Sequence, residues 1–149
     1  MEYLLYDKMY FGDLLAMSAE LWKDIPRNAL ERALRDIEPS GNKEVFFAKD
    51  GETLVGFIYV SIRFDYVEGA DSSPTGYLEG IYVQPEYREK GIARELFQLG
   101  EKWVAQKGCR QIGSDTWAWN EPSIVFHQKI GFGEEDTLVH FIKNIEHTR

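Results

Sequence analysis

The stretch GYLEGIYVQPEYREKGIARELF, residues 76–97, decides the fold. Residues 77–83 are mostly apolar and predict a strand, although the strand contains Glu79, and a carboxylate there costs free energy unless it is paired, exposed or used. Residues 88–93 follow with the pattern Arg-x-x-Gly-x-Ala and open an amphipathic helix. The stretch therefore predicts a strand, a tight turn and a helix in direct succession.

The turn at residues 88–93 has the features of an anion site. A strand that passes into a helix through such a turn points several backbone N–H groups at one spot, with the helix dipole behind them. Gly91 lets a ligand approach the backbone, and Arg88 and Lys90 add positive charge. The pattern is neither a nucleotide P-loop nor a Gly-x-Gly-x-x-Gly motif. On the motif alone, a pyrophosphate site and a merely structural turn with surface charges are both open.

The bulk composition describes one globular unit. The 149 residues suit a single domain, 1–149, and the 44% of hydrophobic and 14% of aromatic residues exclude a disordered chain. The formal net charge of -8 argues against nucleic acid as a partner and indicates cationic partners, although acidic domains are also common for solubility alone.

Targeting, redox and metal signals are weak in this sequence. No apolar run approaches the length that crosses a bilayer, and the N-terminus does not resemble a signal peptide, so we expect a cytoplasmic protein without a membrane partner. The single cysteine, Cys109, excludes an intramolecular disulfide and is expected to be packed or idle. One cysteine and three scattered histidines give no metal-ligand spacing, so no metal is expected.

Hydrophobic periodicity predicts an α/β domain with the order β-α-α-β-β-β-α-β-α-β, in which helices flank a mixed, mostly antiparallel sheet. Asn28 with Glu31 has the form of a capping box for the second helix, and Asp50-Gly51 predicts a hairpin. The expected strands are 2–6, 45–49, 53–64, 77–83, 110–117 and 137–143, and the expected helices are 11–25, 28–37, 92–107 and 120–130.

The segment Val-Gln-Pro-Glu-Tyr-Arg at residues 83–88, followed by the glycine turn, resembles the signature of the GCN5-related N-acetyltransferases (GNAT). The predicted element order is also similar to that family's order, and residues 126–132 look like the helix and Gly-Phe turn beside its cofactor thiol. The resemblance implies acetyl-CoA as cosubstrate, bound by Ile81, Tyr82, Val83, Arg88, Glu89, Lys90, Gly91, Ile92, Ala93, Arg94 and Asn120.

Within this family, the sequence is most similar to the aminoglycoside 6'-N-acetyltransferases. The resemblance implies transfer of acetyl to the 6'-amine of an aminoglycoside, hence antibiotic resistance, and an expected homodimer. The stretches that carry it are residues 21–22, 61–69, 73–83, 114–115 and 141–143.

A polycationic acceptor needs carboxylates for its ammonium groups and an aromatic wall for its sugar faces. The resemblance places Trp22, Tyr66, Glu79 and Asp115 at the family's aminoglycoside-binding positions, and Asp136 where relatives have an acidic contact. Other interpretations remain: the tryptophan as a core aromatic, the tyrosine as a surface residue, Asp115 as a turn cap, and Asp136 as part of a solvated acidic run.

For the chemistry, we expect Asp115 to take the proton from the incoming ammonium, with Glu79 mainly positioning a charge. A backbone N–H of residues 81–83 would stabilise the thioester oxygen in the transition state. His127 stands where many family members have a tyrosine, so it is expected first as a contact to the thiol end and second as a general acid. Trp119 replaces an acidic residue of the subgroup, which would alter the range of substrates.

Two alternative functions also fit the sequence. The first is acetyl transfer to another amine, such as a polyamine or a peptide, which would also suit an acidic site. The second is a domain that binds CoA or an aminoglycoside without catalysis.

Overall fold

A computed structural model describes residues 1–37 and 40–146 of the chain. It divides into two compact units, Met1–Asp115 and Thr116–Arg149, which are described separately below. That the chain acts as one domain stays a prediction. Within the described residues, no helix has the length and apolar composition that spanning a membrane requires.

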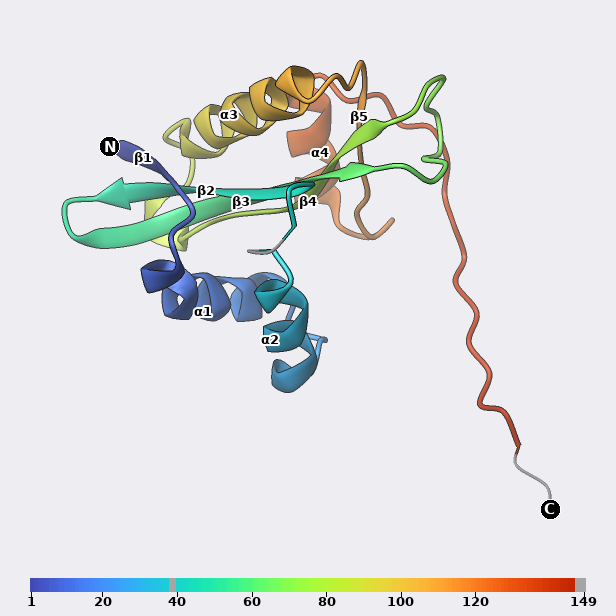
Figure 1. Cartoon of the computed structure of the whole chain (residues 1–149), viewed down its shortest axis with the longest axis horizontal. Helices are drawn as coiled ribbons and strands as arrows, with labels where there is room; N and C mark the ends of the chain where they lie inside the picture. Colours follow the sequence, from blue (N-terminus) through green and yellow to red (C-terminus); the bar gives the residue numbers. More distant parts are fainter. Residues whose placement is uncertain (38–39, 147–149) are drawn as a thin grey trace. The chain divides into compact units, whose positions relative to one another are not determined.

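The first unit is built on a five-stranded sheet with the order β1-β2-β3-β4-β5 (Figure 1). Neighbouring strands are antiparallel except β4 and β5, which are parallel. The predicted mixed, mostly antiparallel sheet is therefore confirmed. The strands are β1 (Glu2–Leu5), β2 (Lys43–Asp50), β3 (Thr53–Arg63), β4 (Thr75–Val83) and β5 (Ile112–Ser114).

Helices cover both faces of this sheet, with α1 and α2 on one face and α3 on the other (Figure 1). Their bounds are α1 (Phe11–Leu21), α2 (Arg27–Arg35) and α3 (Ile92–Gln106), and two short 3-10 turns precede α1 and α3, η1 (Lys8–Tyr10) and η2 (Pro85–Tyr87).

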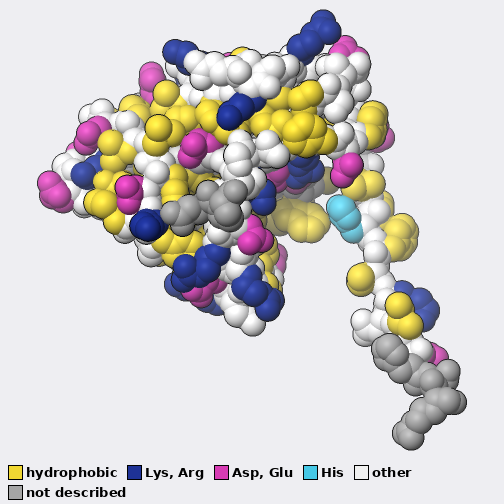
Figure 2. All heavy atoms as spheres, viewed as in Figure 1, with side chains coloured by type: hydrophobic (Ala, Val, Ile, Leu, Met, Phe, Trp, Pro, Cys, Tyr) yellow, Lys and Arg dark blue, Asp and Glu magenta, His cyan; other side chains and the backbone are white. Residues whose placement is uncertain are grey.

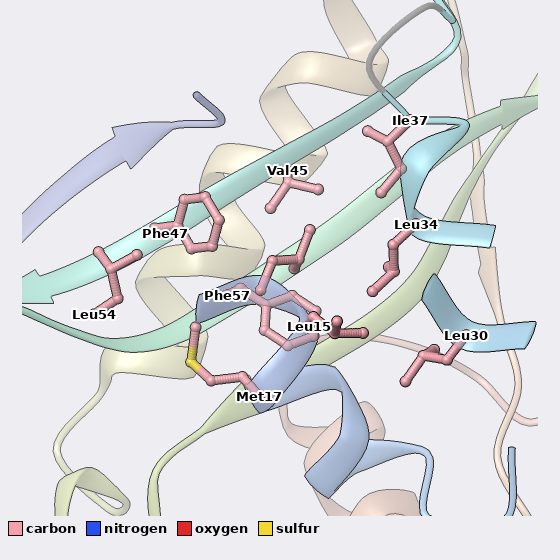
Figure 3. Packing of buried hydrophobic residues seen from close by; sticks show 10 residues of the cluster. Leu15, Met17, Leu30, Leu34, Ile37, Val45, Phe47, Leu54 and Phe57 are labelled. Atoms are coloured by element: carbon pink, nitrogen blue, oxygen red, sulfur yellow. The ribbon is translucent and has the colours of Figure 1, made fainter. Parts of the chain in front are cut away.

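The core between the sheet and the α1–α2 layer is apolar and closely packed (Figure 3). Leu15 and Met17 from α1 and Leu34 from α2 meet Phe47 and Phe57, which are both 0% exposed. Burial of such side chains contributes about 1.5–3 kcal/mol each. This layer fixes the positions of α1 and α2 on the face of the sheet that carries the candidate site.

Two irregularities in β4 shape that face. The register with β3 shifts between Tyr59 and Val60, so that Glu79 is the extra residue of a β-bulge. In addition, β4 pairs with β5 only from Gly76 to Leu78, although β4 continues to Val83. The bulge turns Glu79 toward the α1–α2 side, and the two parallel strands separate just where the glycine turn follows.

The second unit contains α4 (Glu121–Lys129), which the Asn120 side chain caps by accepting a hydrogen bond from the Ser123 N–H at 3.3 Å. The strand predicted at residues 137–143 is wrong for this structure, where residues 133–146 form neither helix nor strand. A strand forms only when its backbone groups pair with a neighbouring strand, and its alternating sequence cannot supply that neighbour.

Three predicted boundaries also differ. The first helix ends at Leu21 rather than at residue 25, and the strand expected over 110–117 has only three residues, Ile112–Ser114. The second helix begins at Arg27, so Asn28 lies inside its first turn and bonds the Ala29 N–H instead of forming a capping box. The break predicted after this helix includes Pro39, which lies outside the described residues.

Candidate active site

A cleft opens between the sheet and the α1–α2 layer, with a volume of about 430 Å³. This volume is within the range of small-molecule sites, about 300–1,000 Å³. Three of the predicted substrate residues, Trp22, Glu79 and Asp115, lie in its wall although they are far apart in the sequence. We call it the α1–α2 cleft; its lining consists of Trp22, Ile25, Leu30, Ala33, Leu34, Asp36, Lys43, Tyr59, Glu79 and Asp115.

Trp22 is half-buried and serves both the core and the cleft. Its ring lies 6.3 Å from that of Phe57 and rests on Gly80, where an added Cβ would come within 2.4 Å of Trp22 Cζ2. A side chain at position 80 would therefore displace the indole. Trp22 therefore packs on the core and lines the cleft, and substrate binding by it stays a prediction.

Glu79 is held by two residues of β3. Arg63 donates from Nη2 to Oε1 at 2.8 Å and from Nε to Oε2 at 3.1 Å, and the Ser61 hydroxyl also donates to Oε2. The side chains of Arg63 and Glu79 are 42% and 21% exposed. The carboxylate that is unexpected in an apolar strand is thus paired, which resolves its energetic cost.

Asp115, the residue that follows β5 and ends the first unit, is bound by a tyrosine. The Tyr77 hydroxyl donates a hydrogen bond to Asp115 Oδ2. Burial, together with the hydrogen bond and charge of Asp115, raises the pKa of Tyr77, which therefore remains a donor at neutral pH. This bond engages Oδ2 of the carboxylate.

The cleft also contains three polar residues that the sequence did not single out, Asp36, Lys43 and Tyr59. Burial, with the charge of Glu79 as the next cause, raises the pKa of Tyr59 to about 12. Asp36 follows α2 as its C-cap, a position where the helix dipole disfavours a carboxylate. With Glu79 and Asp115 it gives the cleft three carboxylates against one lysine.

Two predicted substrate residues are not part of the cleft lining. Tyr66 lies in the connection between β3 and β4 and is 75% exposed. Asp136 belongs to the second unit, where its side chain accepts a hydrogen bond from the Thr137 N–H at 2.7 Å. Substrate binding by either residue stays a prediction.

The glycine turn, residues 88–93, has the backbone that an anion site requires. Glu89 and Gly91 have positive φ angles of 63° and 83°, and Ile92 begins the fifteen-residue helix α3. Such a turn before a helix N-terminus directs successive N–H groups toward one point. An added Cβ at Gly91 meets nothing within 4 Å, so the space over the turn is open.

The basic side chains of this turn contact neighbouring groups of the first unit, and cofactor binding by them stays a prediction. Arg88 folds back: its Nε donates to the Val83 carbonyl at 2.7 Å, and its Cζ lies 5.6 Å from the Tyr82 ring centroid. Lys90 Nζ lies 5.6 Å from the Tyr87 ring centroid. Arg88 therefore braces the end of β4 with its Nε, and an anion at the turn would meet backbone N–H groups first.

The edge of β4 that faces β5 is unpaired beyond Leu78 within the part of the chain described here. Residues 81 and 82 are half-exposed and lie in this segment, between Glu79 and the glycine turn. That these residues meet the cofactor or a developing oxyanion with a backbone N–H stays a prediction.

His127 lies on α4 of the second unit. Its Nδ1 is 2.7 Å from the Ser123 carbonyl oxygen, which can only accept, so Nδ1 carries a proton. In the neutral tautomer Nε2 is then an acceptor, and only the imidazolium can donate a proton from Nε2. The ring also contacts Phe132, with centroids 5.2 Å apart.

No group of three or more metal-ligating side chains occurs among the described residues.

Comparison with known proteins relates most of the chain to one family. The sequence matches the model of the Acetyltransferase (GNAT) family over residues 14–132. An aminoglycoside N(6')-acetyltransferase type 1 of Acinetobacter baumannii is 37% identical over 134 residues, which is 90% of this chain and 92% of the relative.

Two solved structures are also similar. AAC(6')-Ig of Acinetobacter haemolyticus is 29% identical with a TM-score of 0.91, covering 98% of this chain and 100% of its own. AAC(6')-Iy, in complex with the bisubstrate analogue CoA-S-monomethyl-acetylneamine, is 33% identical with a TM-score of 0.89, covering 97% and 98%. With a family match over most of its length and a relative above 30% identity, this chain belongs to the GNAT acetyltransferase family.

Proposed function

We propose that this protein transfers the acetyl group of acetyl-CoA to the 6'-amine of aminoglycosides, directly and in a ternary complex. The observation that carries the proposal is the α1–α2 cleft, in which an indole and three carboxylates surround one opening. An aminoglycoside presents several ammonium groups on flat sugar rings, and it needs those two kinds of partner. The names of the similar proteins support the same acceptor.

The donor is proposed to lie along the free edge of β4, with its pyrophosphate at the glycine turn. Gly91 leaves that space open, and the backbone before α3 supplies N–H donors. Glu79 and Gly91 are separated by the short segment in which β4 ends. Donor and acceptor therefore meet on one strand, which is why a carboxylate and an anion turn are neighbours in the sequence.

In the proposed reaction, Asp115 accepts the proton that the ammonium group must lose before it attacks. Its Oδ1 is the basic atom, since Tyr77 donates to Oδ2. Glu79, which Arg63 and Ser61 hold by hydrogen bonds, is proposed mainly to position a neighbouring charge of the substrate. A backbone N–H of Ile81 to Val83 stabilises the oxyanion that forms at the thioester.

The thiolate leaves with the pantetheine arm, and His127 is proposed to contact it. As a general acid, His127 would have to be the imidazolium, because its Nδ1 proton is committed to the Ser123 carbonyl. Loss of this acid would have a modest effect, since a thiol with a pKa of about 8.5 also leaves as the anion.

The test is an acetylation panel in which thiol release is followed with aminoglycosides that carry a 6'-amine, such as kanamycin and tobramycin, and with analogues that have a 6'-hydroxyl. We expect turnover only with the first group. Spermidine is the competing acceptor, because a polyamine also suits an acidic cleft. Turnover with spermidine alone would reject the aminoglycoside and keep the acetyltransferase; binding without any turnover would reject the enzyme.

We also propose that the protein is a cytoplasmic homodimer. The observation that supports a second copy is in the second unit, where five large apolar side chains stand out along an irregular segment (Figure 2). Their exposed fractions run from 69% to 97%, and such surfaces usually mark an interface. The residues are Leu138, Val139, Phe141, Ile142 and Ile145.

Light scattering after size exclusion tests the dimer. The expected mass is twice the chain mass of 17.3 kDa, and a chain that ends at residue 136 should run as a monomer. A monomeric full-length protein would exclude this role of the apolar segment.

A further inference from the structure

Arg63, a residue to which neither the sequence nor the proposed reaction gives a role, contacts both halves of the acidic site. Its guanidinium makes two hydrogen bonds to Glu79, at 2.8 and 3.1 Å. It also covers the Tyr77 ring, with Cζ 3.4 Å from the ring centroid. Tyr77 in turn donates to Asp115. One arginine therefore touches the charge-holding carboxylate and the tyrosine that orients the proposed base.

The strand register explains why these side chains meet. Ser61 lies directly opposite Tyr77, and Arg63 lies opposite Thr75, so alternate residues of β3 and β4 share one face of the sheet. The bulge then presents Glu79 on this face beside Tyr77. Ser61 and Tyr77 are only 4% and 7% exposed, so Arg63 packs on a buried part of the sheet.

The charges of Arg63 and Glu79 explain why their contact would affect the reaction. Arg63 and Ser61 together bond both oxygens of Glu79, so this carboxylate is held in place as a paired charge. Without the guanidinium, a partly buried carboxylate would lose its partner and would have to move toward solvent or toward another cation. The stacking surface that keeps the Tyr77 ring in place would be lost with it.

We propose that Arg63 is a positioning residue for acetyl transfer: it fixes Glu79 and the Tyr77 ring, and through Tyr77 it orients Asp115 toward the acceptor amine. The inference rests on the proposed function and goes beyond it. It attributes to one arginine the different roles of Glu79, which positions a charge, and Asp115, which takes the proton. Arg63 does not itself touch the reacting atoms.

The test compares Arg63→Met with a matched control, Arg35→Met on α2. Arg35 makes the same two kinds of contact away from the cleft lining: Nη2 lies 2.8 Å from Glu31 Oε1, and Cζ lies 4.3 Å from the Phe11 ring centroid. Each substitution removes one ion pair and one ring contact from an exposed arginine, so a general loss of stability should affect both variants alike.

For Arg63→Met we expect kcat to fall about 10- to 100-fold, the loss that a misplaced catalytic group causes. The KM for the amine should not rise, because the released Glu79 charge still attracts a cation. Arg63→Lys keeps the positive charge but lacks the planar guanidinium that makes two parallel hydrogen bonds and stacks on a ring. Its kcat should therefore lie between those of Arg63→Met and the unsubstituted protein. An unchanged kcat for Arg63→Met, or an equal fall for Arg35→Met, would overturn the proposal.

The route through Tyr77 is tested by a double-mutant cycle. In a Tyr77→Phe background, Arg63→Met should lower kcat by less than about 3-fold, because the orienting hydroxyl is already gone. If the double variant lowers kcat by the product of the two single losses, Arg63 does not act through Tyr77.

Crystal structures of the two variants provide a readout that needs no turnover. We expect Asp115 to turn away from Tyr77 in Arg63→Met and to stay bound in Arg35→Met. An unchanged Tyr77–Asp115 pair in Arg63→Met would overturn the inference, whatever the activity. Absence of acetyl transfer in the unsubstituted protein would instead reject the proposed function.

Discussion

The glycine turn and the α1–α2 cleft differ in how each is built. The turn consists of consecutive residues, 88–93, and its recognition groups are backbone N–H donors set by two positive φ angles. The cleft consists of side chains that come from α1, α2 and three strands, and its charges are distributed among them by hydrogen bonds. A site made of backbone tolerates changes of side chain but not of conformation, whereas a site made of side chains depends on the identity of each one.

The largest effect is expected in the cleft, from Asp115→Asn. The amide keeps the shape of the side chain and removes the base, so kcat should fall by about 10²–10⁴-fold with acetyl-CoA binding unchanged. The matched control is Asp13→Asn, an exposed aspartate in the first turn of α1. Steady-state kinetics with a 6'-amino acceptor measure both variants, and a loss below 3-fold for Asp115→Asn would remove it from the mechanism.

The next effect belongs to the turn. Gly91→Val places a branched side chain at a φ of 83°, which such residues avoid. The side chain also fills the open space above the turn. If two charge-assisted hydrogen bonds to the pyrophosphate are lost, acetyl-CoA affinity should fall by about 3 kcal/mol, roughly 100-fold.

Gly51→Val is the control for backbone strain, because Gly51 has a φ of 60° and equally open surroundings in the β2–β3 hairpin. It should lose a similar stability, about 1–2 kcal/mol, with no loss of acetyl-CoA affinity. Calorimetry that finds equal affinity for the two variants would mean that the turn is structural only.

A smaller effect is expected from Asp36→Asn in the cleft. Its carboxylate is exposed, so one ion pair with the substrate is worth about 0.2–1 kcal/mol, or about 2- to 5-fold in KM. The effect should shrink at high salt, and kcat should not change. Glu52→Gln, an exposed acidic residue of the β2–β3 turn, controls for net charge, and an equal change in KM would exclude a local role for Asp36.

The smallest effect concerns stability at high pH. The pKa of Tyr59 is raised from 10.0 to about 12 in the folded protein, so the unfolded chain loses this proton first. The stability that neutral Tyr59 contributes is therefore complete below pH 10 and is lost as the pH rises toward 12. For this half-buried group we expect a loss of about 1 kcal/mol after solvent screening.

Denaturant unfolding at pH 8 and pH 11 checks this expectation. Tyr59→Phe should lose less stability between the two pH values than the unsubstituted protein does, whereas the exposed Tyr66→Phe should behave like the unsubstituted protein. An identical loss in all three would show that Tyr59 does not titrate in this range.

The same contrast explains what could be predicted from the sequence. The turn and the Asp50-Gly51 hairpin depend on local backbone conformation, and glycine marks such positions directly, as the φ angles of 60° and 83° confirm. Glu79 stood out because an acidic residue interrupts an apolar strand. These features need only a few neighbouring residues.

The partners of the acidic residues could not be found in this way. Arg63 is sixteen residues from Glu79, and Tyr77 is thirty-eight from Asp115, and both pairs depend on strand register and on a bulge. Asp36 ends a surface helix. The strand expected at residues 137–143 failed for a related reason, since periodicity indicates a strand but does not provide its neighbour.

The cleft is proposed to present a 6'-amine to the donor on β4. The most direct measurement is the position of the acetyl group in the product, by two-dimensional NMR of tobramycin after reaction with acetyl-CoA and the enzyme. We expect one product, acetylated on the 6' nitrogen. Acetyl on any other amine, or no acetylated tobramycin while another amine is consumed, would contradict it.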